Sequence, residues 1–216
     1  NISGATTVSQ QTTGAPVGAR YVARVAPTST AQISNFYQLI ETSNVQQLWG
    51  KTVTFSGKIR RNASLTQDMV AVIAKSATVD AAIGSSWSNI GTTTLTNASM
   101  PTGTGAANWL DFSVTATIPA DGTANTIYVG ISSGTVPSGG YYEIALTQLE
   151  IGSVVTSFRR NAPSIQAELA ACQRYYRRGQ IYASGATGGG SSEVTLVAVQ
   201  FPIPMRVTPY AISWIS

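Results

Sequence analysis

Histidine is absent from the sequence, and cysteine occurs once, at Cys172. Catalysis by Ser-His-Asp or Cys-His groups within this chain is excluded, because both need an imidazole base. A zinc site of the usual Cys/His type and an intrachain disulfide are excluded as well. Cys172 falls on the apolar face of a predicted helix, where we expect a small core residue.

Charge is also scarce: 10% of the residues are charged, against about 25% in typical domains. The net charge is +4. Two interpretations stay open, a mildly basic surface without consequence and an attraction to an anionic polymer such as bacterial surface polysaccharide. No nucleic-acid motif accompanies the arginines, so we expect no nucleic-acid partner.

Long apolar runs are missing too. None approaches about 20 residues, so we expect no membrane insertion. The N-terminal stretch NISGATTVSQ lacks the basic and apolar regions of a signal peptide. Because the sequence does not begin with methionine, we expect a fragment of a longer protein.

What the first 160 residues do contain is a series of short alternating segments. In the range 51–61, Val53, Phe55 and Ile59 alternate with polar residues, which predicts one core face and one solvated face. The ranges 109–118 and 126–132 alternate in the same way. About nine such strands separated by turn signals predict an antiparallel β-sandwich or jelly roll.

The other predicted elements of this region are less regular. Val45, Leu48 and Trp49 belong to one expected helical turn with these side chains on its inner side. Trp87 is expected in a polar loop, where a large aromatic residue is unusual unless it packs or binds something. The remaining predicted segments are strands at 21–25, 33–40, 69–74 and 92–96 and loops at 85–91, 99–107 and 134–140.

The stretch 141–178 organises the chain. Its strand places Ile144 and Leu146 on one parity but Leu149 and Ile151 on the other. A strand buried on both faces and a β-bulge between Leu146 and Leu149 both explain this change.

A helix follows, with Ser164 as the predicted N-cap. Its apolar stripe consists of Ile165, Leu169, Cys172 and Tyr176. Its last turn is basic and contains Arg174, Arg177 and Arg178.

These same residues carry a resemblance. The strand ending TQLEIG, the step Phe158-Arg159 and the helix ELAACQRYY resemble a module of bacteriophage tail fibres and tail appendages. FPIPMRVTPY resembles the phrase after the helix in that family. WGKTVTFSGKIR, WLDFSVTATIP and YVGIS…YYEIALTQLE are similar to phrases of carbohydrate-binding jelly rolls. The resemblance implies a jelly roll, a homotrimer and a location in the virion.

The expected fold is therefore all-β: an antiparallel jelly-roll β-sandwich, one α-helix and a small C-terminal β-rich segment. The expected divisions are a linker or fibre-proximal strap (1–18), the jelly roll (19–162), a connecting helix (163–178) and an incomplete tip domain (179–216). Val194, Leu196 and Ala198 alternate with further apolar residues, so this last strand is apolar on nearly both faces. Three copies around a fibre axis would cover it.

Parity predicts a ligand surface on the jelly roll. Residues expected to point away from the core, together with the loop tryptophan, are Lys58, Arg60, Trp109, Asp111, Tyr128 and Trp87. If their strands share a sheet, these residues form a polar aromatic surface that suits a glycan.

The acidic residues bear on two further kinds of site. A glycosidase needs two carboxylates beside one bond, and Asp111 with a second outward carboxylate is the pairing to check. The scattered acids otherwise predict no enzyme. Glu143 and Glu150 flank the central strand and are weak candidates for a structural calcium, with no other cofactor expected.

The predicted function is attachment of a phage tail fibre or tail appendage to host surface polysaccharide, without catalysis and alongside other tail proteins. The alternatives are a carbohydrate-binding module of a polysaccharide-degrading enzyme and a purely structural fibre segment.

Overall fold

The computed structural model describes residues 6–82, 86–160 and 164–173. The chain divides into two units, residues 1–158 and 159–216. All of the strands described below belong to the first unit. The described part of the second unit contains one helix. The predicted C-terminal β segment at 179–216, with its apolar strand, lies outside the described residues.

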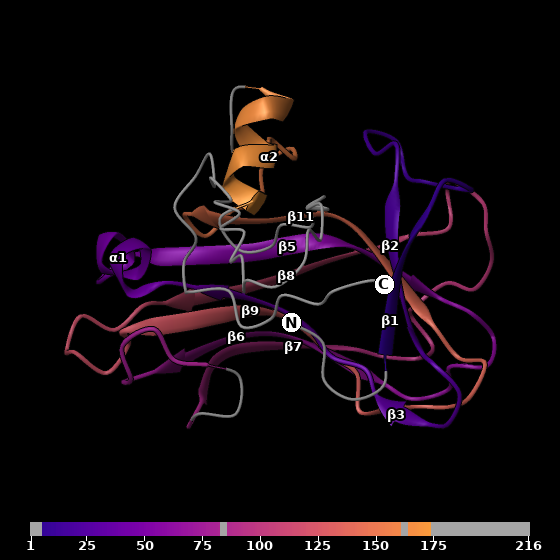
Figure 1. Cartoon of the computed structure of the whole chain (residues 1–216), viewed down its shortest axis with the longest axis horizontal. Helices are drawn as coiled ribbons and strands as arrows, with labels where there is room; N and C mark the ends of the chain where they lie inside the picture. Colours follow the sequence, from indigo (N-terminus) through magenta and orange to yellow (C-terminus); the bar gives the residue numbers. More distant parts are fainter. Residues whose placement is uncertain (1–5, 83–85, 161–163, 174–216) are drawn as a thin grey trace, which may run out of the picture. The chain divides into compact units, whose positions relative to one another are not determined.

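Two antiparallel sheets form a jelly-roll β-sandwich, as predicted (Figure 1). The five-stranded sheet runs β1 (Thr6–Gln11), β2 (Val22–Pro27), β11 (Tyr142–Ile151), β5 (Thr52–Arg61), β8 (Leu110–Thr117). The four-stranded sheet runs β4 (Phe36–Ile40), β9 (Thr126–Ser132), β6 (Met69–Ser76), β7 (Ser88–Leu95). A two-stranded ribbon joins β3 (Gln32–Ile33) to β10 (Thr135–Val136).

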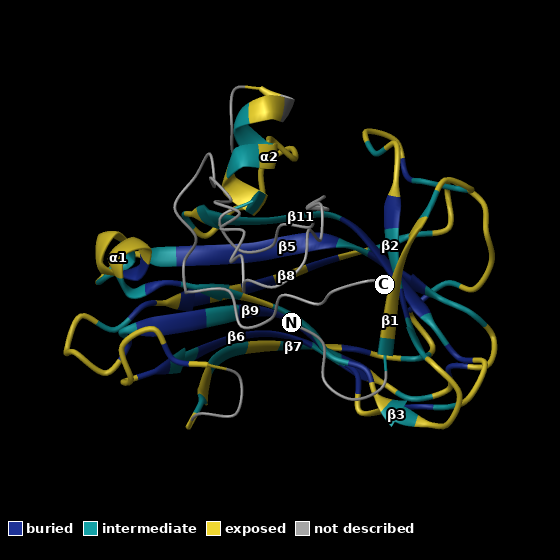
Figure 2. Ribbon diagram, viewed as in Figure 1, coloured by how far each residue is buried: buried dark blue, intermediate teal, exposed yellow. Residues whose placement is uncertain are grey.

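The hydrophobic core lies between the two large sheets, and strands β5 and β6 are buried along most of their length (Figure 2). Alternation places Val53, Phe55 and Ile59 of β5 inward, where they meet Ile127 and Ile131 of β9. In β8 every second residue is buried or nearly so, as the strict alternation predicts. Because these core-facing residues are confirmed, the residues between them must point outward.

Strand β11 contains the β-bulge that was one of the two explanations for its change of parity. Its register against β5 shifts between Ala145 and Gln148, so two residues oppose Gly57 alone. Leu146 adopts a φ of 52°, in the left-handed region. Before the bulge Ile144 faces the core, and after it Leu149 packs against the core.

Glycine at position 57 makes room for this bulge. A Cβ there would lie 2.9 Å from Phe112 Cζ and 3.0 Å from Thr147 Cγ2. Both distances are shorter than a normal carbon contact, which is about 3.5–4.0 Å. The bulge and the aromatic side chain beside it therefore depend on the missing side chain.

Four predicted boundaries are corrected. Strand β1 lies inside the stretch 1–18 that was assigned to a linker, and β7 begins at Ser88, within the predicted loop. The predicted strand 33–40 is broken because Ser34 N and Asn35 Oδ1 bond to Ser133, not to a neighbouring strand. Strand β10 falls within the predicted loop 134–140. Three of these strands are polar or short, so alternation gives no signal for them.

The predicted helical turn is confirmed as α1 (Thr42–Val45) followed by a 3₁₀ turn (Gln46–Leu48). Val45 is fully buried, and Leu48 and Trp49 pack against the core. Trp49 Nε1 donates a hydrogen bond to the Ala124 carbonyl at 2.8 Å. This tryptophan is therefore part of the core at one end of the sandwich.

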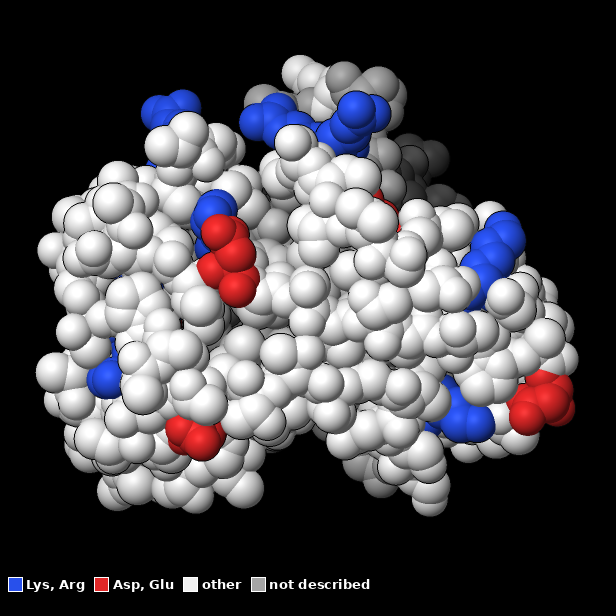
Figure 3. All heavy atoms as spheres, turned by 180° about the vertical axis from the view of Figure 1, so that it is seen from behind, with Lys and Arg blue, Asp and Glu red and all other residues white. Residues whose placement is uncertain are grey.

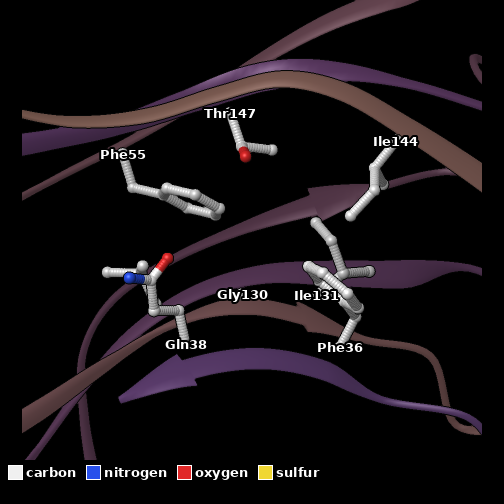
Figure 4. Close-up of a pocket in the computed structure, with 8 residues that line it drawn as sticks. Phe36, Gln38, Phe55, Gly130, Ile131, Ile144 and Thr147 are labelled. Carbon is white, nitrogen blue, oxygen red and sulfur yellow. The ribbon is translucent and has the colours of Figure 1, made fainter. Parts of the chain in front are cut away.

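A small cavity lies between the sheets (Figure 4), where Phe36 and Gln38 of β4 approach Phe55, Ile144 and Thr147. Its volume is about 30 Å³. A water molecule needs about 10–15 Å³ on this measure, so the cavity could hold about two waters. It is too small for a sugar ring.

The second unit contains α2 (Ile165–Gln173). Ser164 Oγ accepts a hydrogen bond from Ala167 N at 3.2 Å, which confirms the predicted N-cap. Leu169 is 55% exposed and Cys172 is exposed, so the expected core position of this cysteine is wrong. Helical spacing shows which residues share a face but does not show whether that face is covered. Tyr176 and the basic last turn lie outside the described residues.

No helix within the described residues is long and apolar enough to cross a membrane.

Candidate binding surfaces

The predicted ligand surface is divided between the two sheets. Lys58, Arg60 and Asp111 lie on the outer face of the five-stranded sheet, with Trp109 just before β8. Tyr128 belongs to β9 in the other sheet. The expectation of one shared surface is therefore wrong, because parity tells an inward from an outward side chain but does not tell which sheet carries it.

Arg24, Arg60 and Glu143 form a largely buried ionic group that we call the arginine cluster. Arg60 Nε donates to Glu143 Oε2 at 2.5 Å, and both side chains are 1% exposed. Arg24 Nε and Nη2 donate to Glu143 Oε1 at 2.9 and 2.6 Å. One carboxylate thus accepts hydrogen bonds from two guanidinium groups supplied by neighbouring strands.

Two chain segments, one before β2 and one before β8, cover the rest of Arg60. Nη1 donates to the carbonyls of Gly14 and Gly105, both at 3.0 Å, and Nη2 donates to the carbonyl of Thr13 at 3.1 Å. The guanidinium carbon lies 4.4 Å from the ring centre of Trp109, whose Nε1 also donates to Gly14. The predicted solvent exposure of Arg60 is therefore wrong.

Lys58 and Asp111 form a surface ion pair at 2.5 Å, with side chains 28% and 76% exposed. Such pairs contribute about 0–1 kcal/mol to stability. The only ion-pair partner found for Asp111 within the described residues is this lysine. A pairing of Asp111 with a second outward carboxylate stays an untested expectation.

The two calcium candidates lie on β11. Glu143 belongs to the arginine cluster, and Glu150 accepts hydrogen bonds from Thr156 N at 2.9 Å and Thr156 Oγ1 at 2.6 Å. Within the described residues no group of three acidic, histidine or cysteine side chains gathers as a metal site would require. Calcium binding by these residues stays a prediction.

A second group of aromatic residues, Tyr37, Trp87 and Tyr128, lies on the outer face of the four-stranded sheet, and we call it the aromatic cluster. The ring centres of Tyr37 and Tyr128 are 4.5 Å apart, and those of Trp87 and Tyr128 are 4.8 Å apart in an edge-on contact. All three side chains are half-buried. Trp87 thus packs against Tyr128, and its placement in a polar segment is explained.

Strand register brings these rings together. Tyr37 on β4 is paired with Gly130 on β9, and Tyr128 lies two residues before that glycine. A Cβ at position 130 would lie 2.6 Å from Tyr37 Cδ1, so the tyrosine ring occupies the space that a side chain would fill. Tyr37 was missed in the sequence because β4 is short and its partner strand lies about ninety residues away.

The tyrosine hydroxyls are held neutral. Burial raises the pKa of Tyr37, although hydrogen bonds with Ser132 and Tyr128 oppose the shift. Burial, and then the neighbouring Tyr37, raise the pKa of Tyr128 to about 12. At neutral pH both hydroxyls therefore remain protonated and can donate as well as accept hydrogen bonds.

Uncharged polar residues border the aromatic cluster. The exposed Asn89, Thr92 and Thr94 of β7 share its side of the sheet, because they pair with the outward residues of β6. On the side of the molecule seen in Figure 3, charged side chains are few and scattered among uncharged ones. Strand β7 therefore presents hydroxyl and amide groups on the same side of the sheet as the half-buried rings.

The chain matches no family model, and no curated protein matches it. Solved structures do match it. One described as "CBM4 structure and function" is 16% identical, with a TM-score of 0.43, and the match covers 69% of this chain and 81% of that one. A xylan-binding domain from CBM 22 is 14% identical, with a TM-score of 0.47, and covers 72% and 88%.

The enzymatically active domain of tailspike protein 4 from bacteriophage CBA120 also matches, at 10% identity and a TM-score of 0.43, over 70% of this chain but 18% of that one. Most of the similar structures are described as carbohydrate-binding modules. At these identities and TM-scores the likeness does not place the chain in a family.

Proposed function

We propose that this chain binds a carbohydrate through the aromatic cluster. The observation that carries the proposal is the contact of three partly exposed rings, from Tyr37, Trp87 and Tyr128, on the outer face of one sheet. Aromatic rings in contact on an outer face form a continuous apolar surface, and such surfaces, when large, often mark interaction sites.

The chemistry of the aromatic cluster suits a sugar. A pyranose ring has an apolar face of C–H groups that can pack on an aromatic ring, and an edge of hydroxyls that need hydrogen-bond partners. The neutral hydroxyls of Tyr37 and Tyr128 and the exposed amide of Asn89 offer such partners. Tyrosine and tryptophan supply this contact area at a low cost in side-chain entropy.

The test is a binding screen of the full chain against immobilised bacterial and plant polysaccharides, followed by calorimetry on the best ligand. We expect Trp87→Ala and Tyr128→Ala to weaken binding at least about tenfold, which corresponds to ~1.4 kcal/mol. Tyr21→Ala is the matched control, because Tyr21 is 43% exposed but lies just before β2 of the other sheet.

The proposal fails if both cluster variants bind as tightly as the unchanged protein, or if Tyr21→Ala weakens binding equally. Thermal unfolding of each variant shows whether a loss of binding comes from a loss of fold.

Two biological settings are compatible with this role. The first is a non-catalytic tail fibre or tail appendage of a phage virion, assembled as a homotrimer with other tail proteins and directed at host surface polysaccharide. The sequence resemblance favours it. The second is a carbohydrate-binding module attached to a polysaccharide-degrading enzyme, and it agrees at least as well with how most of the similar structures are described.

The complete reading frame distinguishes these settings. A tail-attachment segment upstream of this chain would identify the first, and a catalytic domain would identify the second.

A further inference from the structure

The arginine cluster contains one more positively charged group than negatively charged groups. Its two guanidinium groups, from Arg24 and Arg60, share the single carboxylate of Glu143. One guanidinium is enough to neutralise a buried carboxylate. The cluster therefore carries a net charge of +1 (two arginines minus one glutamate).

The excess charge is accessible at Arg24 only. Arg60 is 1% exposed and is surrounded by Glu143 and by three backbone carbonyls. The side chain of Arg24 is 28% exposed. The neighbouring pair of Lys58 and Asp111 is already neutral. We propose that the exposed edge of Arg24 binds an anionic group, a carboxylate or a sulfate or phosphate ester carried by a glycan.

Arg24 is held in place for such a contact. Its Nε and Nη2 donate to Glu143, and its guanidinium carbon lies 3.9 Å from the ring centre of Tyr141. Within the described residues its Nη1 donates no hydrogen bond. An arginine fixed by a carboxylate on one edge and by a ring on one face loses little side-chain entropy when an anion reaches its free edge.

Strand β1 supplies polar groups beside this edge. Ser9 is paired with Arg24 across the β1–β2 ladder and is exposed. Gln11 Nε2 donates to Ser9 Oγ at 2.9 Å. The Ser9 hydroxyl can therefore donate a second hydrogen bond to an anion at Arg24, and the remaining groups of the ligand can extend over the exposed surface of β1.

This proposal does not depend on the aromatic cluster. Arg24 lies on the five-stranded sheet and the aromatic cluster on the four-stranded sheet. Substitutions at one surface should leave binding at the other unchanged, so the two proposals can fail separately.

The experiment titrates the full chain with an oligogalacturonide and with the same oligosaccharide as its uncharged methyl ester, by calorimetry at low salt. The acid form is expected to bind, and the methyl ester at least about tenfold more weakly, as the loss of one charge-assisted contact predicts. Arg24→Gln is expected to weaken binding of the acid form by a similar factor. Lys51→Gln, which removes the same charge from an exposed lysine with no ion pair in the described residues, is the matched control.

Arg24→Lys guards against misfolding, because it keeps a cation beside Glu143 but lacks the planar fork. It should unfold at nearly the unchanged temperature and bind the acid form several-fold more weakly. Equal binding by the unchanged protein and folded Arg24→Gln would overturn the proposal. So would an equal loss in Lys51→Gln, which would mean general attraction to the net charge, or equal binding of the acid and its methyl ester.

Discussion

Arg60 illustrates what parity predicts for a single residue and what it leaves open. Alternation along β5 correctly placed Arg60 on the face opposite the core, but loops from two distant parts of the chain bury it. Thr54 and Ser56 on the same face are also buried. A strand pattern describes the two faces of a sheet, and no local pattern shows which loops will lie across them.

The aromatic cluster shows the same limit. Tyr128 was correctly predicted to point outward, and Trp87 was recognised as unusual. The contact between them depends on strand pairings that connect residues far apart in sequence. Tyr37 carried no signal of its own, because its role depends on the glycine opposite it.

Ionisation of the Tyr128 hydroxyl should lower the stability of the folded protein at high pH. Its pKa is raised from 10.0 to about 12, so the folded protein holds this proton after the unfolded chain has lost it. The free energy of unfolding should therefore be unaffected by this group below about pH 10 and should fall between about pH 10 and pH 12.

Ultraviolet absorbance of the phenolate and chemical denaturation, both followed against pH, test this expectation. In Tyr128→Phe the part of the tyrosine titration near pH 12 should be reduced, and the fall in stability above pH 10 should be smaller. An unchanged titration curve in that variant would contradict the assignment.

Among the elements, β11 was the best predicted. Its change of parity left two explanations, and the bulge opposite Gly57 decides between them. Strand β1 could not be predicted, because its hydroxyl and amide side chains are largely exposed and its place in the sheet comes from backbone pairing with β2. A strand that buries little apolar surface leaves no periodic signal in the sequence.

The pairing of β4 with β9 requires a glycine at position 130. A Cβ at position 130 would lie 2.2 Å from the Phe36 carbonyl oxygen, a backbone atom that cannot move without breaking the ladder. Gly130→Ala should therefore lower the free energy of unfolding by about 1–3 kcal/mol. Because Tyr37 would be displaced, glycan binding should weaken as well.

Urea unfolding measures the first effect and calorimetry the second. Gly105→Ala is the matched control, since its nearest new contact is a flexible asparagine side chain at 3.4 Å. Equal stability of the two variants would show that β4 is not held against β9 as described.

For the whole molecule, the division into residues 1–158 and 159–216 bears on assembly. The first unit has its own buried core. In the second, the apolar stripe of α2 is exposed at Leu169 and Cys172. The proposed homotrimer would cover this stripe and the apolar strand predicted near residue 196, both in the region from 163 to the end of the chain.

Light scattering on the full chain and on a shortened chain ending near Asn161 tests the trimer. We expect a trimeric mass for the full chain and a monomeric, folded sandwich for the shortened one. A monomeric full chain, or a shortened chain that trimerises equally well, would refute the placement of these contacts.

The surroundings of Arg60 also bear on the order in which the sandwich forms during synthesis. Its partners lie near residues 14, 105 and 143, so the guanidinium is fully satisfied only after most of the first unit has left the ribosome. Contacts of such high sequence separation are slow to form, because long loops must close first. We therefore expect the segment around Thr13 and Gly14 to be among the last parts of the first unit to settle, in the step that buries this charge.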